Sequence, residues 1–270
     1  MNKLMQRVIT AVVLLAVLLM VFFVLPRPAA VGVLGAFIIV AAWEWGGFLT
    51  LDTFFRRAAY VVLLVALMII SVRILPERMS LLPVLWVGLV WWICAFALVL
   101  RYPIKIRRDL GAVCGVLVII PAWAAMVALL ESGEDGPKYV LLVLSIVWAA
   151  DIGAYFFGRR LGRTKLAPSL SPGKTWEGVI GGLLTAMVAA LAGAWWLHLP
   201  AVFLVPVALS VAAISIVGDL TVSMFKRNAG LKDSGNLFPG HGGVLDRIDS
   251  VSAAVPLFVL EATWLGLVGS

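Results

Sequence analysis

The sequence predicts an all-α, polytopic integral membrane protein with about nine transmembrane helices and a cytoplasmic N-terminus. Of its 270 residues, 63% are hydrophobic and only 13% are charged, whereas a soluble domain carries about a quarter charged residues. The apolar runs last about 18–22 residues, which suits a helix that crosses a bilayer and is about twice the length of a barrel strand. Because only helices and closed barrels satisfy their backbone groups in lipid, a soluble core is excluded.

The first apolar run extends from Val8 to Leu25 and exceeds the about 7–15 residues of a signal-peptide core. It is therefore interpreted as an uncleaved first span, with cleavage near Ala29 and Ala30 as the alternative. We expect one region over residues 1–135, with spans 1–5, and a catalytic region over 136–270, with spans 6–9 and two cytoplasmic loops. The expected spans are 8–25, 29–48, 58–75, 81–100, 110–130, 138–158, 178–198, 201–222 and 250–268.

The distribution of positive charge sets the expected orientation, because cytoplasmic loops are enriched in Lys and Arg. With the N-terminus inside, 17 of the 21 Lys and Arg residues fall on the cytoplasmic side. The acidic loop 131–135 falls outside. The net charge of +7 then describes a basic cytoplasmic face that attracts anionic membrane lipids, and nothing indicates nucleic acid. The four Lys and Arg residues that fall on the outer side are Arg27, Arg73, Arg78 and Lys138.

The first long cytoplasmic loop follows the sixth span, over about 159–177. Asp151 lies inside the apolar run that precedes it, where a carboxylate is expensive and is either functional or paired. We expect Pro172 to Thr175 to form a turn that presents Lys174. This turn looks superficially like the end of a phosphate-binding P-loop, but Pro168 stands where that motif needs Gly and no strand is expected before it. Glu177 is either a helix-start carboxylate or a site residue.

The second long loop, over about 223–249, collects both signs of charge between two apolar segments. Asp219 closes the eighth span, and Ser223, Lys226 and Arg227 follow it at +4, +7 and +8. If the helix continues, these four residues share one face. Two cations alone would serve as a membrane anchor, but an anchor does not need the carboxylate. We therefore expect this face to handle a charged substrate at the headgroup level.

The loop ends in a glycine-rich turn, Phe238 to Gly243, that lets backbone N–H groups approach a ligand closely. Asp246 and Asp249 follow at i, i+3 with Arg247 beside them, and they open the ninth span. They are either helix-start acids or ligands for a hard divalent cation such as Mg²⁺. His241, among oxygen ligands, fits a phosphate contact better than a metal bond, and zinc is disfavoured because no Cys/His cluster is present.

At these residues the chain closely resembles the phosphatidate cytidylyltransferases, also called CDP-diacylglycerol synthases. The C-terminal signature of that family is met at every fixed position. The earlier segments, Asp151-x-Gly153-Ala154-Tyr155 and Ser171-Pro172-x-Lys174-Thr175-Trp176-Glu177-Gly178, resemble its other recurrent motifs. The matching signature positions are Ser223, Phe225, Lys226, Arg227, Lys232, Asp233, Gly235, Phe238, Pro239, His241 to Val244 and Asp246 to Asp249.

The resemblance implies transfer of CMP from CTP to phosphatidic acid in the inner (cytoplasmic) membrane, at a site that faces the cytoplasm. It also implies a homodimer. The cofactor it implies is Mg²⁺, and a second cation is left open. Catalysis is assigned to Asp219, Lys226, Arg227, Asp246 and Asp249, and metal binding to Asp151, Asp219, Asp246 and Asp249. Substrate binding is assigned to Ser171, Lys174, Ser223, Lys232, Asp233, His241, Gly242, Gly243 and Arg247, with the backbone of Gly240 beside them.

A secondary transporter that uses Asp151 and Asp219 as coupling sites is the main alternative. Transport sites lie near the membrane midplane, whereas the charge of this chain collects at one face. A lipid-dependent scaffold would need neither Asp219 nor the His-Gly-Gly turn. The Asp-rich spacing of the CDP-alcohol phosphatidyltransferases does not occur in this sequence.

Overall fold

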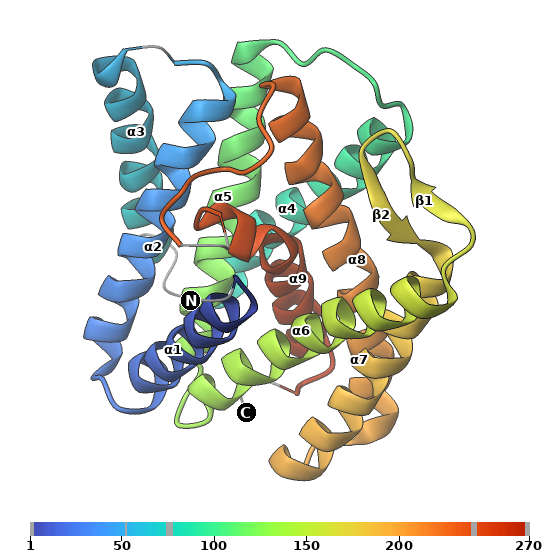
Figure 1. The fold of residues 1–270 in the computed structure, drawn as a ribbon. Coiled ribbons are helices and arrows are strands. Elements are labelled where there is room, and N and C mark those ends of the chain that lie inside the picture. Colours follow the sequence, from blue (N-terminus) through green and yellow to red (C-terminus); the bar gives the residue numbers. More distant parts are fainter. Residues whose placement is uncertain (1–2, 52, 74–77, 239–241, 268–270) are drawn as a thin grey trace.

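The computed structural model describes residues 3–51, 53–73, 78–238 and 242–267. These residues form nine helices and one antiparallel hairpin (Figure 1), which confirms the all-α class. The elements are α1 (Lys3–Phe23), α2 (Arg27–Phe48), α3 (Phe54–Arg73), α4 (Arg78–Leu100), α5 (Arg108–Leu130), α6 (Gly136–Leu161), β1 (Lys165–Ala167), β2 (Ser171–Thr175), α7 (Trp176–Leu197), α8 (Ala201–Asn228) and α9 (Leu245–Trp264).

Seven helices of the described chain, α2 to α8, are long and apolar enough to cross a membrane. The apolar part of α1 is shorter and covers Val12–Phe23. Helix α9 carries four charged residues among its 20. The chain is therefore a polytopic membrane protein, while the count of nine spans and the orientation of the N-terminus stay predictions.

Helices α5 and α9 lie in the middle of the bundle (Figure 1), and α5 is the most buried of the candidate spans. Two clusters of buried apolar side chains hold the bundle together, and each includes residues from before and after residue 135. Thus Leu129 packs in one cluster with Phe258, and Trp45 packs in the other with Met224. The two expected regions therefore share their cores.

Small residues bring together the helices that carry the charged side chains. On α6, a Cβ at Gly153 would lie 2.7 Å from the carbonyl oxygen of Gly181 on α7, and Thr185 donates a hydrogen bond across this contact to Ala149. On α8, a Cβ at Gly218 would lie 2.5 Å from the carbonyl oxygen of Asp249. Close backbone approach through small residues is typical of packing between membrane helices. Asp219 and Asp249 are thereby fixed on two touching helices.

The prediction of a turn over Pro172 to Thr175 is wrong, because these residues form strand β2. Strand β2 pairs antiparallel with β1, with Lys165 opposite Thr175 and Ala167 opposite Ser171. A strand therefore does precede the P-loop-like segment, although Pro168 still occupies the position where that motif needs Gly. The strands are short, and Pro and Gly are depleted in strands, which is why the sequence pattern did not reveal them.

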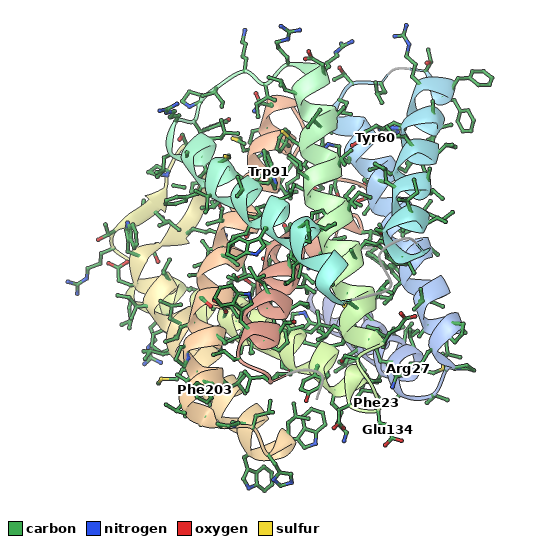
Figure 2. All side chains as sticks on the ribbon, turned by 180° about the vertical axis from the view of Figure 1, so that it is seen from behind. Phe23, Arg27, Tyr60, Trp91, Glu134 and Phe203 are labelled. Atoms are coloured by element: carbon green, nitrogen blue, oxygen red, sulfur yellow. The ribbon has the colours of Figure 1, made fainter. Side chains whose placement is uncertain are left out.

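The start of α2 and the α5–α6 loop lie at the same end of the bundle, as the labels of Arg27 and Glu134 show (Figure 2). Arg27 donates a hydrogen bond of 2.7 Å to the carbonyl oxygen of Gly133 and also bonds the carbonyl oxygen of Leu130. The connection before α2 and the acidic loop 131–135 are both predicted on the outer side. Their contact places them on the same side of the bundle, and which side that is stays a prediction.

Candidate functional site

Asp219 lies on α8 and is joined to the first long loop by an ion pair. Its Oδ2 lies 2.6 Å from the Nζ of Lys174 on β2, and its Oδ1 accepts a hydrogen bond of 3.2 Å from Ser223 one turn further along. The spacing of four residues predicted that Asp219 and Ser223 share a face, and this is confirmed. The side chains of Lys174 and Asp219 are 26% and 27% exposed, so neither is fully covered by the bundle.

Asp246 lies in the first turn of α9 and is paired with Lys226 near the end of α8. Its Oδ1 lies 2.6 Å from the Lys226 Nζ, and the two side chains are only 6% and 12% exposed. Its Oδ2 accepts hydrogen bonds from the backbone N–H of Ser234 at 2.7 Å, from that of Gly243 at 3.1 Å, and from the Ser234 hydroxyl at 3.0 Å. Four donors therefore fix this carboxylate, which ties α8, α9 and the segment between them together.

The turn before α9 owes its shape to glycine. Gly242 has a φ of +77°, which a residue with a side chain adopts only under strain. A Cβ at Gly242 would also lie 2.5 Å from the Oδ2 of Asp246. The backbone N–H of Phe238 donates to the Gly242 carbonyl oxygen at 2.9 Å and closes the turn. His241, Gly240 and Pro239 lie outside the described residues.

Two further carboxylates belong to the same region. Asp151 on α6 and Asp249 on α9 lie close enough to Asp219 for the carboxylates to repel one another, and Lys174 and Arg247 lie close enough to Asp151 to attract it. Asp249 also accepts a hydrogen bond of 2.8 Å from the Ser250 backbone. Three helices thus contribute acidic groups to one neighbourhood that both long loops supply with cations.

The predicted metal ligands are near one another but do not form a closed ligand set. Within the part of the chain that the structure describes, no three Asp, Glu, His or Cys side chains are arranged to hold a metal ion. Asp219 and Asp246 instead each have a lysine partner, Lys174 and Lys226. The donors are nevertheless carboxylate oxygens, which suit a hard cation such as Mg²⁺.

Several of the remaining predicted residues have more solvent access than these pairs. Arg227 is exposed and its guanidinium lies 3.4 Å from the Leu231 carbonyl oxygen, while Ser171 opens strand β2. Glu177 lies in the first turn of α7 and accepts a hydrogen bond of 3.1 Å from the Thr164 backbone, so the structure gives it a local role. Lys232, Asp233 and Arg247 are exposed.

Sequence reasoning missed Glu44, a carboxylate on α2 that is 7% exposed. It accepts hydrogen bonds from the backbone N–H groups of Val244 at 3.0 Å and Leu245 at 2.8 Å, and from the Ser234 hydroxyl at 2.7 Å. The signal was present, because Glu44 interrupts an apolar run just as Asp151 does. It was overlooked because it lies far in sequence from both loops.

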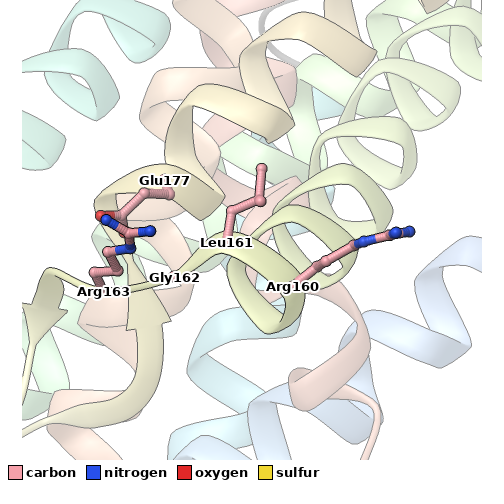
Figure 3. A pocket seen from close by; sticks show the side chains of 5 residues that line it. All are labelled: Arg160, Leu161, Gly162, Arg163 and Glu177. Atoms are coloured by element: carbon pink, nitrogen blue, oxygen red, sulfur yellow. The ribbon is translucent and has the colours of Figure 1, made fainter.

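A pocket of about 460 Å³ lies beside this region, at the junction of α6 and α7. Its lining residues come from the end of α6, the following link and the first turn of α7. Figure 3 shows Arg163 and Glu177 next to each other on one side and Arg160 projecting away on the other. None of the paired carboxylates of the two loops lines it. The lining is Arg160, Leu161, Gly162, Arg163 and Glu177.

A model of the Cytidylyltransferase family matches residues 5–264 of this chain. The chain belongs to this family. A phosphatidate cytidylyltransferase of Pseudomonas aeruginosa is 45% identical over 276 residues, which cover 94% of each protein. A phosphatidate cytidylyltransferase of Haemophilus influenzae is 40% identical over 282 residues, which cover 94% of this chain and 96% of that protein. One of Brucella suis is 47% identical over 139 residues, or 51% of this chain and 52% of that protein.

Proposed function

We propose that this chain transfers CMP from CTP to phosphatidic acid, which gives CDP-diacylglycerol and pyrophosphate for phospholipid biosynthesis. Family membership over almost the whole chain and relatives named phosphatidate cytidylyltransferase support the reaction. The structural observation that carries it is the 2.6 Å pairing of Lys174 with Asp219. This pair joins the first long loop to α8, and the end of α8 carries Lys226, the partner of Asp246.

The reaction joins two anions, so it requires positive charge that neutralises their phosphates, and the residues of this site provide it. An oxygen of the phosphatidic acid phosphate attacks the α-phosphorus of CTP, a new P–O bond forms, and pyrophosphate leaves with the electrons of the broken bond. The attacking phosphate is already ionised at neutral pH, so no strong general base is needed. Most of the catalytic work is positioning and charge neutralisation. Lys174, Lys226, Arg227, Lys232 and Arg247 supply positive charge for the phosphates.

The carboxylates suit a metal-assisted version of this transfer. Asp219 and Asp246, with Asp249 and Asp151 beside them, would hold Mg²⁺, and a second cation is compatible with four carboxylates. Bound Mg²⁺ would neutralise phosphate oxygens and help to align the attacking and leaving groups. Lys174 now pairs with Asp219, and Lys226 pairs with Asp246. Lys174 and Lys226 would then turn toward the substrate phosphates.

The proposal places the site at the cytoplasmic face of the bacterial inner membrane. One substrate is soluble and the other lies in the bilayer, so the reaction belongs at the headgroup plane. The charge asymmetry between loops supports nine spans with the N-terminus in the cytoplasm. A homodimer is proposed from the family resemblance alone. His241, in the glycine-rich turn, is proposed to bond a substrate phosphate.

The transporter alternative is not supported, because the relatives are named for a transferase and the paired charges gather at one end of α8 and α9. The test incubates the purified protein with labelled CTP, phosphatidic acid and Mg²⁺. Formation of a labelled lipid together with pyrophosphate is the expected result. Solute uptake into vesicles without any labelled lipid would contradict the proposal and favour a transporter.

A further inference from the structure

Glu44 connects the N-terminal half of the bundle to the segment between α8 and α9. Its carboxylate is buried, although it belongs to α2 and lies 190 residues before Ser234 in the sequence. A buried carboxylate is costly unless hydrogen bonds compensate its charge. Three donors do so here, and all three belong to the 234–245 segment. The Glu44 carboxylate therefore attaches that segment to α2 through hydrogen bonds.

The first two bonds place the start of α9. The backbone N–H groups of Val244 and Leu245 are among those that a helix leaves without a partner at its N-terminus. No side chain at the N-cap position, Val244, satisfies them, and Glu44 accepts from both instead. Negative charge is also favourable at this end of a helix. Glu44 thus performs, from another helix, the role that a local cap usually has.

The third bond leads to Asp246. The Ser234 hydroxyl lies 2.7 Å from Oε2 of Glu44 and 3.0 Å from Oδ2 of Asp246, so one hydroxyl group is shared by two carboxylates. The backbone N–H groups of Ser234 and Gly243 bond Asp246 as well. A Cβ at Gly243 would overlap the Glu44 carboxylate. The second glycine of the His-Gly-Gly turn therefore leaves room for Glu44.

We propose that Glu44 is a positioning residue for CMP transfer, which acts through Ser234 and the N-terminus of α9 to fix Asp246 and its partner Lys226. Its carboxylate is buried against the donors of the 234–245 segment, so its effect is transmitted through the residues it holds. The inference rests on the proposed function for its catalytic consequence. Its structural part, the attachment of the 234–245 segment to α2, can be measured without turnover.

The test compares Glu44→Gln with the wild-type protein and with Ser234→Ala. Glutamine keeps the shape of glutamate but replaces one carboxylate oxygen with an NH₂ group. On that side, the N–H or hydroxyl donor that bonds Glu44 would face another donor. We expect kcat to fall by about 10- to 100-fold, as when a supporting residue of a site is lost. We also expect KM to rise for CTP or phosphatidic acid, because Lys226 is displaced. A mere loss of folded enzyme would lower kcat at unchanged KM.

Glu261→Gln is the matched control. Like Glu44, Glu261 accepts a hydrogen bond from a serine hydroxyl, that of Ser210 at 2.7 Å, although Glu261 is only part-buried. It lies about 22 Å along α9 from Asp246 at 1.5 Å per residue. Its variant should keep wild-type kcat and KM. The double variant of Glu44 and Ser234 should lose less activity than the product of the two single losses, because both single variants remove the Glu44–Ser234 hydrogen bond.

Amide hydrogen exchange provides the readout that does not depend on turnover. Exchange of peptides that cover residues 234–246 should accelerate in Glu44→Gln and stay unchanged in Glu261→Gln. Wild-type kcat and exchange in Glu44→Gln, or losses that multiply in the double variant, would overturn the proposal. If the wild-type protein forms no CDP-diacylglycerol, the proposed function fails by itself. The exchange comparison still decides whether Glu44 holds the segment.

Discussion

Replacing Asp246 with Asn tests whether the Lys226–Asp246 pair is a structural support as well as part of the site. Four donors converge on the carboxylate, three of them on Oδ2 and the Lys226 ammonium on Oδ1. In one orientation of the amide, its NH₂ group faces the ammonium, and in the other it faces two backbone N–H groups. Removing one partner of a buried ion pair costs about 3–5 kcal/mol, and each orphaned backbone donor costs about 1–3 kcal/mol.

Either orientation gives a loss of about 3 kcal/mol in the free energy of unfolding. At about 2–4 °C per kcal/mol for a chain of this size, Tm should fall by about 6–12 °C. The assay is thermal unfolding of the purified protein in detergent, followed by tryptophan fluorescence.

Asp135→Asn is the control for Asp246→Asn. Asp135 makes an ion pair of the same 2.6 Å length with Lys138, but its side chain is 52% exposed. Exposed pairs contribute about 0–1 kcal/mol, so its Tm should fall by no more than about 4 °C. Equal Tm values for the two variants would refute the conclusion that burial and four converging donors make Asp246 a structural support.

Three further predictions concern the site. Asp219→Asn should abolish CDP-diacylglycerol formation in membranes while the protein still inserts, and retained activity would refute the metal assignment. Lys174→Met should reduce kcat/KM by at least about 100-fold, because a charge that faces a phosphate-transfer site is removed; an effect below threefold would show that Lys174 only stabilises the hairpin. Gly242→Ala should lower the free energy of unfolding by about 1–3 kcal/mol through backbone strain at positive φ. Its Tm is measured beside that of Gly32→Ala, a position where φ is not positive and a Cβ would meet open space, and equal Tm values would contradict the strain.

The helices could be predicted from the sequence because each apolar run carries its own signal. Nine runs became nine helices within the described residues, and their bounds shifted by a few residues, most at α8, which continues to Asn228. The extension mattered, since it places Ser223, Lys226 and Arg227 on the helix of Asp219. The hairpin 165–175 gave no such signal, because its strands are short and contain Pro and Gly.

The site could be predicted only as far as local spacing reaches. The contact between Asp219 and Ser223 follows from helical periodicity. The location of Asp246 in the first turn of a helix follows from where the ninth apolar run begins. The pairing of Lys174 with Asp219 depends on how α6, α7 and α8 pack, so the sequence indicated two loops but not which atoms meet. Glu44 and Ser234 show the limit most clearly. Their hydrogen bond spans 190 residues, and no spacing rule links positions so far apart.

Transfer of CMP by this protein can be measured by following both ends of the CTP molecule in one reaction. Purified protein is incubated with phosphatidic acid, Mg²⁺ and CTP labelled either at the α-phosphate or at the γ-phosphate, with Asp219→Asn as the inactive control. We expect α-label in the lipid, γ-label in pyrophosphate, and the two products in equal amounts. Release of the γ-label as inorganic phosphate, or no α-label in the lipid, would contradict it.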